Sequence, residues 1–378
     1  MNSNNETMNV LSDLIEFESV TPDKSDCQKY IDNYLSKFGF ETKYFKYGDV
    51  NNMIASLGKG NPCLAFIGHT DVVPPGELSL WKSNPYTLSH NDGLLTGRGT
   101  ADMKGGIACF MTAVKDYVQN NKEINGSIKI ILTADEEGDA TNGIRKMVEE
   151  RVFQKNEIDY CLVGEPSSSD EIGDVIRNGR RGSITGHLTL FGIQGHVAYP
   201  EKADNPIHSS SKIISKFLDI KFDNGNEYFP PTSFQISNIN AGTGVDNVIP
   251  ADIKIAFNIR YSTETSADEI KSKITDIIES EDIKYEITWK HSGEPFLTTD
   301  KEFMNICKQS IKSLTNQDVI VSTNGGTSDG RFMAKVCNQV IELGLTNRSI
   351  HKINESIRAD DLEKLKNIYQ DILVNIFK

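Results

Sequence analysis

The sequence predicts an α/β protein in which a mainly parallel sheet covered by helices is interrupted by a smaller, inserted α+β domain of two layers. Two observations lead to this prediction. Short apolar segments of strand length alternate with segments of helical periodicity in residues 1–179 and again in residues 294–378, an order typical of parallel sheets. Residues 180–293 instead combine four expected strands with two expected helices, so we expect a separate domain there.

The first block begins with a helix, because apolar residues such as Val10, Leu11 and Leu14 recur at the spacing of one helix face. A second helix is expected to end at Gly39. A loop rich in proline and glycine is expected from residue 70 to residue 100. The expected helices of this block cover residues 9–17, 25–38, 105–119 and 143–151, and the expected strands cover residues 41–47, 53–57, 63–68, 127–133 and 160–163.

The inserted block is expected to form a small open sheet with helices on one face. Its strands are expected at residues 183–191, 233–239, 253–259 and 284–289, and its helices at residues 206–218 and 267–278. The last block returns to alternation, with helices at residues 301–314 and 359–377 and strands at residues 319–322 and 339–341.

Composition excludes several classes of protein. The chain carries 40 basic and 53 acidic residues, a formal net charge of −13, so we expect no nucleic acid partner. No segment reaches the roughly 20 apolar residues that span a bilayer, and we expect no membrane association. The N-terminus lacks the features of a secretory signal. The six cysteines are scattered, without a C-x-x-C pair, which favours a reducing compartment, and we expect a cytoplasmic protein.

Imidazole and carboxylate side chains gather near the ends of expected strands, where ligands bind in open α/β sheets. His69 ends one strand, and Glu137 and Glu165 follow two others. Asp102 follows the long loop, and His351 lies near the C-terminus. Singly, such residues are most often satisfied histidines or parts of solvated turns. Together, the five suit zinc or a similar metal, and one carboxylate could bridge two ions about 3.5–4 Å apart.

The candidate ligands lie in five short motifs. These motifs are His69-Thr-Asp71, Gly99-Thr-Ala-Asp102-Met-Lys-Gly-Gly106, Asp135-Glu-Glu137-Gly138, Gly164-Glu165-Pro166 and the segment around His351. In this order they resemble the aminoacylase/carboxypeptidase family of co-catalytic zinc hydrolases, and the resemblance covers nearly the whole chain. It implies a zinc-peptidase-like catalytic domain formed by residues 1–179 and 294–378, with residues 180–293 as an inserted lid and dimerisation domain.

The resemblance implies two Zn²⁺ ions per subunit, for which Co²⁺ can substitute. By resemblance, Asp102 bridges both ions. His69 and Glu165 would complete the first metal site, and Glu137 and His351 would complete the second.

The same resemblance implies the chemistry of amide hydrolysis. Glu136 would be the general base, and Asp71 would orient His69 by a hydrogen bond. Adjacent residues on extended backbone point to opposite sides, so Glu137 could bind metal while Glu136 faces the water. His196 would stabilise the oxyanion from the other subunit of a homodimer, formed through the inserted domain.

Further motifs are similar to one subgroup of the family. They are Asn178-Gly-Arg180-Arg181-Gly-Ser183, Gly192-Ile-Gln-Gly-His196-Val-Ala-Tyr199-Pro200, Asn247-Val-Ile-Pro250 and Thr323-Asn-Gly-Gly-Thr327-Ser-Asp-Gly-Arg-Phe332. This subgroup hydrolyses N-succinyl-LL-2,6-diaminopimelate to succinate and LL-2,6-diaminopimelate, which serves lysine and cell-wall precursor synthesis. The expected partner is thus a small anionic substrate, and arginines would bind its carboxylates through paired hydrogen bonds. The substrate contacts implied by the resemblance are Arg180, Tyr199, Asn247, Arg260, Thr327 and Asn347.

Two alternatives stay open. One is another amidohydrolase of the same family, such as an acetylornithine deacetylase or a dipeptidase, against which the motif at Arg180 argues. The other is a metal-free paralogue acting as a binding protein, against which the complete ligand set and Glu136 argue. The chain departs from the subgroup at Asp246 and Ser356, where the subgroup has Thr and Cys; neither position is an expected metal ligand.

Overall fold

The computed structural model describes residues 6–121, 123–155 and 157–378. Residues 1–5, part of the segment in which we expect no secretory signal, lie outside the described residues. The chain divides into two compact units. Unit 1 is formed by Met1–Gly179, Leu297–Ser322 and Ser328–Lys378, and unit 2 by Arg180–Phe296 and Thr323–Thr327.

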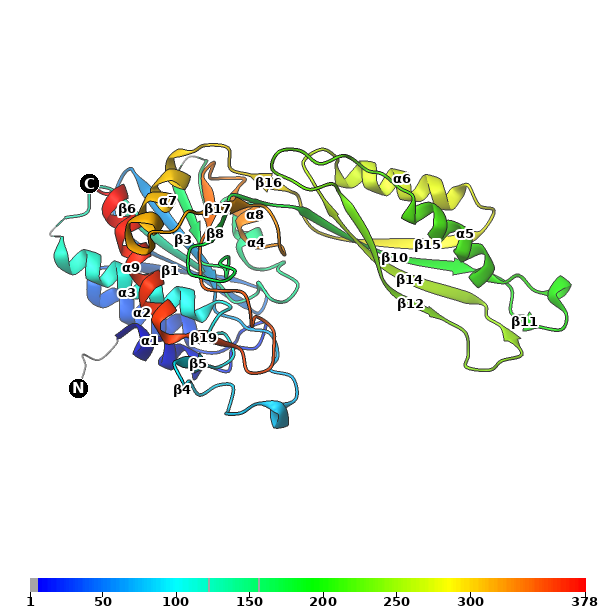
Figure 1. The fold of residues 1–378 in the computed structure, drawn as a ribbon, viewed down its shortest axis with the longest axis horizontal. Helices are drawn as coiled ribbons and strands as arrows, with labels where there is room; N and C mark the ends of the chain where they lie inside the picture. Colours follow the sequence, from blue (N-terminus) through cyan, green and yellow to red (C-terminus); the bar gives the residue numbers. More distant parts are fainter. Residues whose placement is uncertain (1–5, 122, 156) are drawn as a thin grey trace. The chain divides into compact units, whose positions relative to one another are not determined.

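Unit 1 contains a large mixed sheet and the helices that cover it (Figure 1). Its helices are α1 (Glu6–Ile15), α2 (Cys27–Leu35), α3 (Lys104–Asn120), α4 (Ile144–Glu149), α7 (Glu302–Thr315), α8 (Gly330–Met333) and α9 (Ala359–Ile376). Its strands are β1 (Glu41–Tyr47), β2 (Val50–Gly58), β3 (Cys63–His69), β4 (Ser89–Asn91), β5 (Leu94–Thr96), β6 (Ser127–Thr133), β7 (Tyr160–Val163), β8 (Val175–Arg177), β17 (Ile320–Ser322), β18 (Val340–Glu342) and β19 (Ser356–Arg358). The chain passes between the units through β9 (Gly179–Arg180) and β16 (Phe296–Leu297), and again on either side of residues 323–327.

Within the described residues, eight strands form the main sheet in the order β1-β2-β6-β3-β7-β18-β8-β17. The four inner strands β6, β3, β7 and β18 run parallel. Strands β1 and β2 are antiparallel to their neighbours, and β18 is antiparallel to β8. The expected fold class is confirmed, and its parallel part is the centre of a mixed sheet. The carboxyl ends of four adjacent strands therefore lie at one edge.

The core of unit 1 lies between the central strands and the helices that pack on them. Every residue of β3 is buried, as expected for a strand covered on both faces. Helix α3 packs against β3, α1 and α9. Phe66 on β3 stacks on Phe110 of α3 with 4.2 Å between ring centroids, and Tyr369 of α9 meets both rings edge-on. This packing fixes the strand that carries His69.

Unit 2 contains an antiparallel sheet with two helices on one face. Its strands are β10 (Gly182–Phe191), β11 (Gly195–His196), β12 (Ser233–Ala241), β13 (Val248–Ile249), β14 (Asp252–Tyr261) and β15 (Lys284–Gly293), and its helices are α5 (Pro206–Leu218) and α6 (Ala267–Glu279). The sheet has the order β12-β14-β10-β15. Buried and less buried residues alternate along β14, because helices cover one face of the sheet. Ser266 and Glu269 form a capping box that begins α6.

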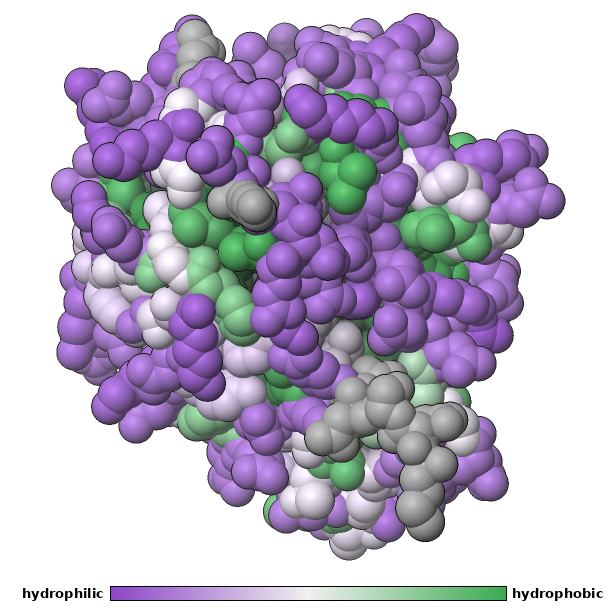
Figure 2. Space-filling view, turned by 90° about the vertical axis from the view of Figure 1, so that its left-hand side faces the viewer, coloured by the Kyte–Doolittle hydropathy of each residue, from purple (hydrophilic) through white to green (hydrophobic). Residues whose placement is uncertain are grey.

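On the face of the molecule drawn in Figure 2, hydrophilic residues predominate and apolar residues form small separate areas. In the described part of the chain, no helix is long and apolar enough to cross a membrane. The six cysteines are buried and free.

Candidate active site

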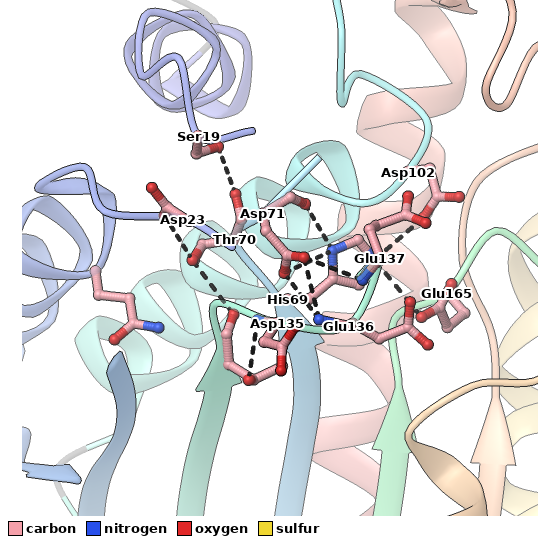
Figure 3. Close-up of polar contacts among 12 residues, drawn as sticks. Ser19, Asp23, His69, Thr70, Asp71, Asp102, Asp135, Glu136, Glu137 and Glu165 are labelled. Carbon is pink, nitrogen blue, oxygen red and sulfur yellow. Dashed lines mark hydrogen bonds and ion pairs between the residues drawn. The ribbon is translucent and has the colours of Figure 1, made fainter. Parts of the chain in front are cut away.

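The inner strands of the main sheet bring four candidate residues to one edge. His69 is the last residue of β3, Glu136 and Glu137 follow β6, and Glu165 follows β7. Because these strands are adjacent and parallel, the side chains meet at their carboxyl ends. Figure 3 shows the carboxylates arranged around the imidazole of His69.

Asp102 lies next to this group and faces two histidines. Its Oδ1 atom lies 3.3 Å from Nε2 of His69, and its Oδ2 atom lies 3.4 Å from Nε2 of His351. His69 Nε2 is also 3.7 Å from Oε1 of Glu165, and His351 Nε2 is 3.0 Å from Oε1 of Glu137. The five expected ligands thus form two clusters that share one carboxylate.

Two groups of side chains could each hold a metal ion among the residues that the structure describes. One is His69, Glu136 and Glu165, and the other is His69, Asp102 and Glu137; within each group the candidate ligand atoms lie within 4.8 Å of one another. Nitrogen and carboxylate ligands of this kind suit zinc. Several carboxylates share a largely buried space here, and buried carboxylates require compensating positive charge. The donor set therefore fits a pair of divalent ions.

Asp71 contacts His69 in a way that the sequence did not indicate. Nδ1 of His69 lies 2.8 Å from the main-chain carbonyl oxygen of Asp71, and 3.7 Å from its carboxylate Oδ1. The Asp71 carboxylate instead accepts hydrogen bonds from the main-chain N–H groups of Glu136 and Glu137 at 3.0–3.2 Å. It thereby holds the segment that carries two other site residues.

Glu136 and Glu137 lie in a bend after β6, not on extended backbone. Our expectation that strand geometry separates their side chains is therefore wrong in its reason. The side chains still reach different neighbours: Glu136 groups with His69 and Glu165, and Glu137 contacts His351. The bend, held by Asp71, produces this separation.

Burial dominates the electrostatics of Glu136. Burial, together with the nearby charge of Asp329, raises its pKa to about 8. The guanidinium of Arg331, 3.8 Å from Glu136 Oε1, and His69 act in the opposite direction. Burial, with the charge of Asp102, also raises the pKa of Glu165 well above its usual value. Without a cation, the site holds these carboxyl groups in an environment that disfavours their charge.

The environment favours the charged form of both histidines, whereas it disfavours the charged form of these two glutamates. Burial opposes the charged form of His69, but its hydrogen bond to Asp102 and the charges of Glu165 and Asp71 together raise its pKa well above the usual value. Hydrogen bonds to Asp102 and Glu137 raise the pKa of His351 to about 10. Both imidazoles occupy positions where positive charge is favoured, as a metal ligand site requires.

The expected substrate contacts lie mostly in unit 2. His196 and Tyr199 are exposed, with 5.8 Å between their ring centroids, and Asn247 is exposed beside them, accepting a bond from Val197 at 3.1 Å. Thr327 is half-buried in the same unit. The half-buried Asn347 belongs to unit 1.

The two expected carboxylate-binding arginines both belong to unit 2. Arg180 is buried and donates to the Asn324 carbonyl at 2.9 Å. The half-buried Arg260 donates to Asn258 Oδ1 at 2.9 Å.

Three buried charged residues near the candidate ligands were not predicted. Asp329 and Arg331 lie close to Glu136, within a segment whose pattern resembles the family but implied no role for them. Glu355 contacts the loop of Asp102. The only indication in the sequence was that each of the three lies in or next to a family motif. The residues that they contact are evident only in the folded structure.

A family model described as peptidase family M20/M25/M40 matches residues 65–375. The chain belongs to this family. A succinyl-diaminopimelate desuccinylase from Hydrogenovibrio crunogenus is 47% identical to this M20 chain over 373 residues, covering 98% of the chain and 99% of that relative. A protein of the same name from Psychrobacter arcticus is 47% identical over 384 residues, covering 98% and 94%.

Solved structures of other proteins have the same fold. A metallo-carboxypeptidase of the family from Sulfolobus solfataricus superimposes with a TM-score of 0.82 at 16% identity, covering 99% of each chain. An aminopeptidase from Bacillus cereus gives a TM-score of 0.80 at 20% identity, covering 99% of this chain and 98% of the other. At these identities the likeness establishes the M20 fold.

Proposed function

We propose that this chain is a metal-dependent amidohydrolase that converts N-succinyl-LL-2,6-diaminopimelate to succinate and LL-2,6-diaminopimelate. The choice of substrate is supported by the names of relatives that match 98% of the chain at 47% identity. The reaction class rests on one observation: the two carboxylate oxygens of Asp102 face different histidines, His69 at 3.3 Å and His351 at 3.4 Å. A carboxylate so placed suits the bridge of a two-metal hydrolase.

The ligand assignment follows the two clusters. Asp102 would be shared by two ions, His69 and Glu165 would hold one of them, and Glu137 and His351 would hold the other. When bound, two Zn²⁺ ions, or Co²⁺ in their place, supply Lewis-acid polarisation of the amide carbonyl and lower the pKa of water.

Glu136 takes a proton from the attacking water and returns it to the leaving amine. Its side chain is 12% exposed and lies beside His69 and Glu165, so it reaches the site; it could itself join these two as a ligand, but the five-residue assignment leaves it as the base. Arg331 and Asp329 are the charged neighbours that set its basicity, with Asp71 holding its main chain. Asp71 also orients His69, through its carbonyl oxygen.

The substrate contacts are proposed from the family pattern. Arg180 and Arg260 bind the carboxylates of the substrate, each able to form two parallel hydrogen bonds. Polar contacts come from Tyr199, Asn247, Thr327 and Asn347. We further infer a homodimer formed through unit 2, in which His196 donates a hydrogen bond to the oxyanion in the partner's site. The exposure of His196 leaves it available for that role.

The six free, buried cysteines suit a reducing compartment, so the cytoplasm stays our proposal for localisation.

Hydrolysis by metal-depleted and metal-restored protein tests this function. The protein is treated with a chelator, dialysed, and assayed before and after addition of Zn²⁺ or Co²⁺. Three substrates are compared: N-succinyl-LL-2,6-diaminopimelate, N-acetylornithine and a dipeptide. We expect turnover only after metal is restored, with the highest kcat/KM for the succinyl substrate.

Two results would contradict the proposal separately. Undiminished turnover by protein shown to contain no metal would overturn the two-metal site. A higher kcat/KM for N-acetylornithine or the dipeptide would retain the reaction class and overturn the substrate.

A further inference from the structure

We propose that Glu355 is a positioning residue of the metal centre, which fixes the loop of Asp102 and joins it to the segment of His351. This inference rests on the proposed function, because it requires Asp102 and His351 to bind metal. Glu355 is itself too deeply buried to meet substrate, with 1% of its surface exposed.

The Glu355 carboxylate accepts hydrogen bonds from several donors of one loop. Its Oε1 atom accepts from the main-chain N–H groups of Ala101 at 2.8 Å and Asp102 at 3.0 Å. Its Oε2 atom accepts from the N–H of Gly99 at 3.1 Å and from Nη1 of Arg98 at 2.6 Å. An ionised carboxylate has enough acceptor positions for all four bonds.

These bonds determine where Asp102 lies. The residues from Gly97 to Asp102 form neither strand nor helix, so no regular ladder fixes their main chain. The N–H of Gly97 also bonds to the main-chain oxygen of Glu355 at 3.0 Å. The loop is therefore anchored at both ends to one residue, and the last anchor is the amide of the bridging residue itself.

Glu355 also connects the two metal clusters through the chain. It lies four residues after His351, in the segment between β18 and β19. A shift of Glu355 would displace Asp102 through its hydrogen bonds and His351 through the main chain. The distance of 3.4 Å between Asp102 Oδ2 and His351 Nε2 depends on both segments.

Arg98 compensates the charge of Glu355. Its guanidinium is 2% exposed, lies 5.3 Å from the centroid of the Trp81 ring and also donates to the carbonyl of Pro74 at 3.3 Å. A buried ion pair of this kind could serve stability alone, and the experiment must separate that role from positioning.

Asp361 provides the matched control. It is also a carboxylate with 1% exposure in unit 1, and it pairs with Arg358 through two bonds of 2.9 and 3.0 Å at the start of α9. Asp361→Asn removes a buried, arginine-paired charge without touching the loop of Asp102. Glu355→Gln keeps the size of the side chain but brings an amide NH₂ against donors, so it loses bonds to the loop.

Zinc affinity is measured by competition with a chromophoric chelator, and the Co²⁺-loaded proteins are compared by visible absorption, each after circular dichroism has verified folding. For Glu355→Gln we expect zinc affinity to fall about 10- to 100-fold, the usual effect of removing a residue that orients metal ligands. The cobalt spectrum should change. Asp361→Asn should match wild type in both readouts even if its melting temperature falls.

If Glu355→Gln does not fold, Glu355→Asp replaces it, because this variant keeps the charge but withdraws the carboxylate by one methylene. A folded Glu355 variant with wild-type zinc affinity and cobalt spectrum would overturn the inference. An equal decrease in zinc affinity in Asp361→Asn would also overturn the inference, because the effect would then follow from lost stability. If wild-type protein binds no metal, the proposed function fails together with this inference.

Discussion

Glu136 is surrounded by charges that act on it in opposite directions. Burial and Asp329 raise its pKa, whereas His69 and Arg331 lower it. Cations at the neighbouring ligands would lower the pKa further. A base balanced in this way can take up and release a proton near neutral pH, which is the range in which general bases are efficient.

Glu136→Gln should therefore abolish most turnover while metal binding persists. The amide keeps the size of the side chain but cannot accept the proton, and loss of a general base typically lowers the rate about 10²–10⁴-fold. Steady-state kinetics and metal analysis of the purified variant measure both effects. Glu137→Gln is the contrasting neighbour, because it should lose metal affinity as well. Near wild-type turnover in Glu136→Gln would exclude this residue as the base.

Zinc binding should release protons at neutral pH. The hydrogen bonds to Asp102 and Glu137 raise the pKa of metal-free His351 to about 10, so its imidazole is protonated below that pH. A metal ligand must be the neutral imidazole, so binding expels a proton and zinc affinity should rise with pH up to that pKa. Calorimetry in buffers of different ionisation enthalpy measures the proton count. His351→Ala should release fewer protons, and a binding heat independent of the buffer would contradict the prediction.

At the scale of residues, the sequence indicated side chains better than contacts. His69, Glu137 and Glu165 could be selected because imidazole and carboxylate groups recur where strands end. The hydrogen bonds from the main-chain N–H groups of Glu136 and Glu137 to Asp71 could not be predicted, because every residue except proline has a main-chain N–H and the sequence does not show which ones meet a carboxylate. Partners separated by 65 residues become evident only after the sheet has formed.

The loop before α3 depends on a glycine. Gly99 has φ +90°, and a Cβ there would lie 2.8 Å from Cγ1 of Val72. Gly93, in the turn between β4 and β5, has φ +76° and open space around it. Both positions disfavour other residues by backbone conformation, but at Gly99 the added atom also meets packed side chains.

Gly99→Ala should therefore destabilise unit 1 more than Gly93→Ala. The backbone conformation alone accounts for about 1–2 kcal/mol in each variant. Crowding against Val72 adds about 1–3 kcal/mol at Gly99. Urea denaturation of the two variants measures the difference in free energy of unfolding. Equal losses would show that the loop moves aside to accept the methyl group.

Elements were predicted well where they are long. The expected bounds of β1 (Glu41–Tyr47), β6 and α5 match those in the structure. Each of these elements has at least seven residues, which is enough for its apolar periodicity to be recognised. Strands β4, β5, β8 and β19 have three residues each and were missed, although the three-residue strands β17 and β18 were predicted to within one residue. Two of the missed strands lie in the segment expected to be a loop, since proline and glycine dominate its composition.

At the scale of the whole molecule, mixed dimers test the proposed role of His196. Alone, His196→Ala should lower turnover about 10²–10³-fold, the usual effect of losing an oxyanion donor. Mixed with Glu136→Gln under subunit exchange, it should regain activity, because one site of each heterodimer then carries neither defect. Turnover after mixing, with heterodimer formation verified by tagged subunits, is the measurement. Heterodimers as inactive as their parents would place His196 in its own subunit's site or outside catalysis.

One short segment belongs to unit 2 although the order of helices and strands predicts that it belongs to unit 1. Residues 323–327 group with unit 2, although the chain on either side belongs to unit 1. Thr323 Oγ1 donates to the carbonyl of Tyr228 at 2.6 Å, and the carbonyl of Asn324 accepts from Arg180. Five residues without periodicity carry no signal of their own, so only these contacts reveal where they belong.

The position of β18 in the main sheet has a consequence for biosynthesis. A ribosome delivers the chain from the N-terminus, so residues 180–296 emerge complete before residues 340–342 exist. Strand β18 lies between β7 and β8, at the interior of the sheet. The nascent enzyme must therefore keep the edge of β7 unpaired while residues 180–339 are synthesised, and unpaired edges invite association between chains. Slow translation between residues 296 and 340 would prolong that exposure and so favour association between nascent chains.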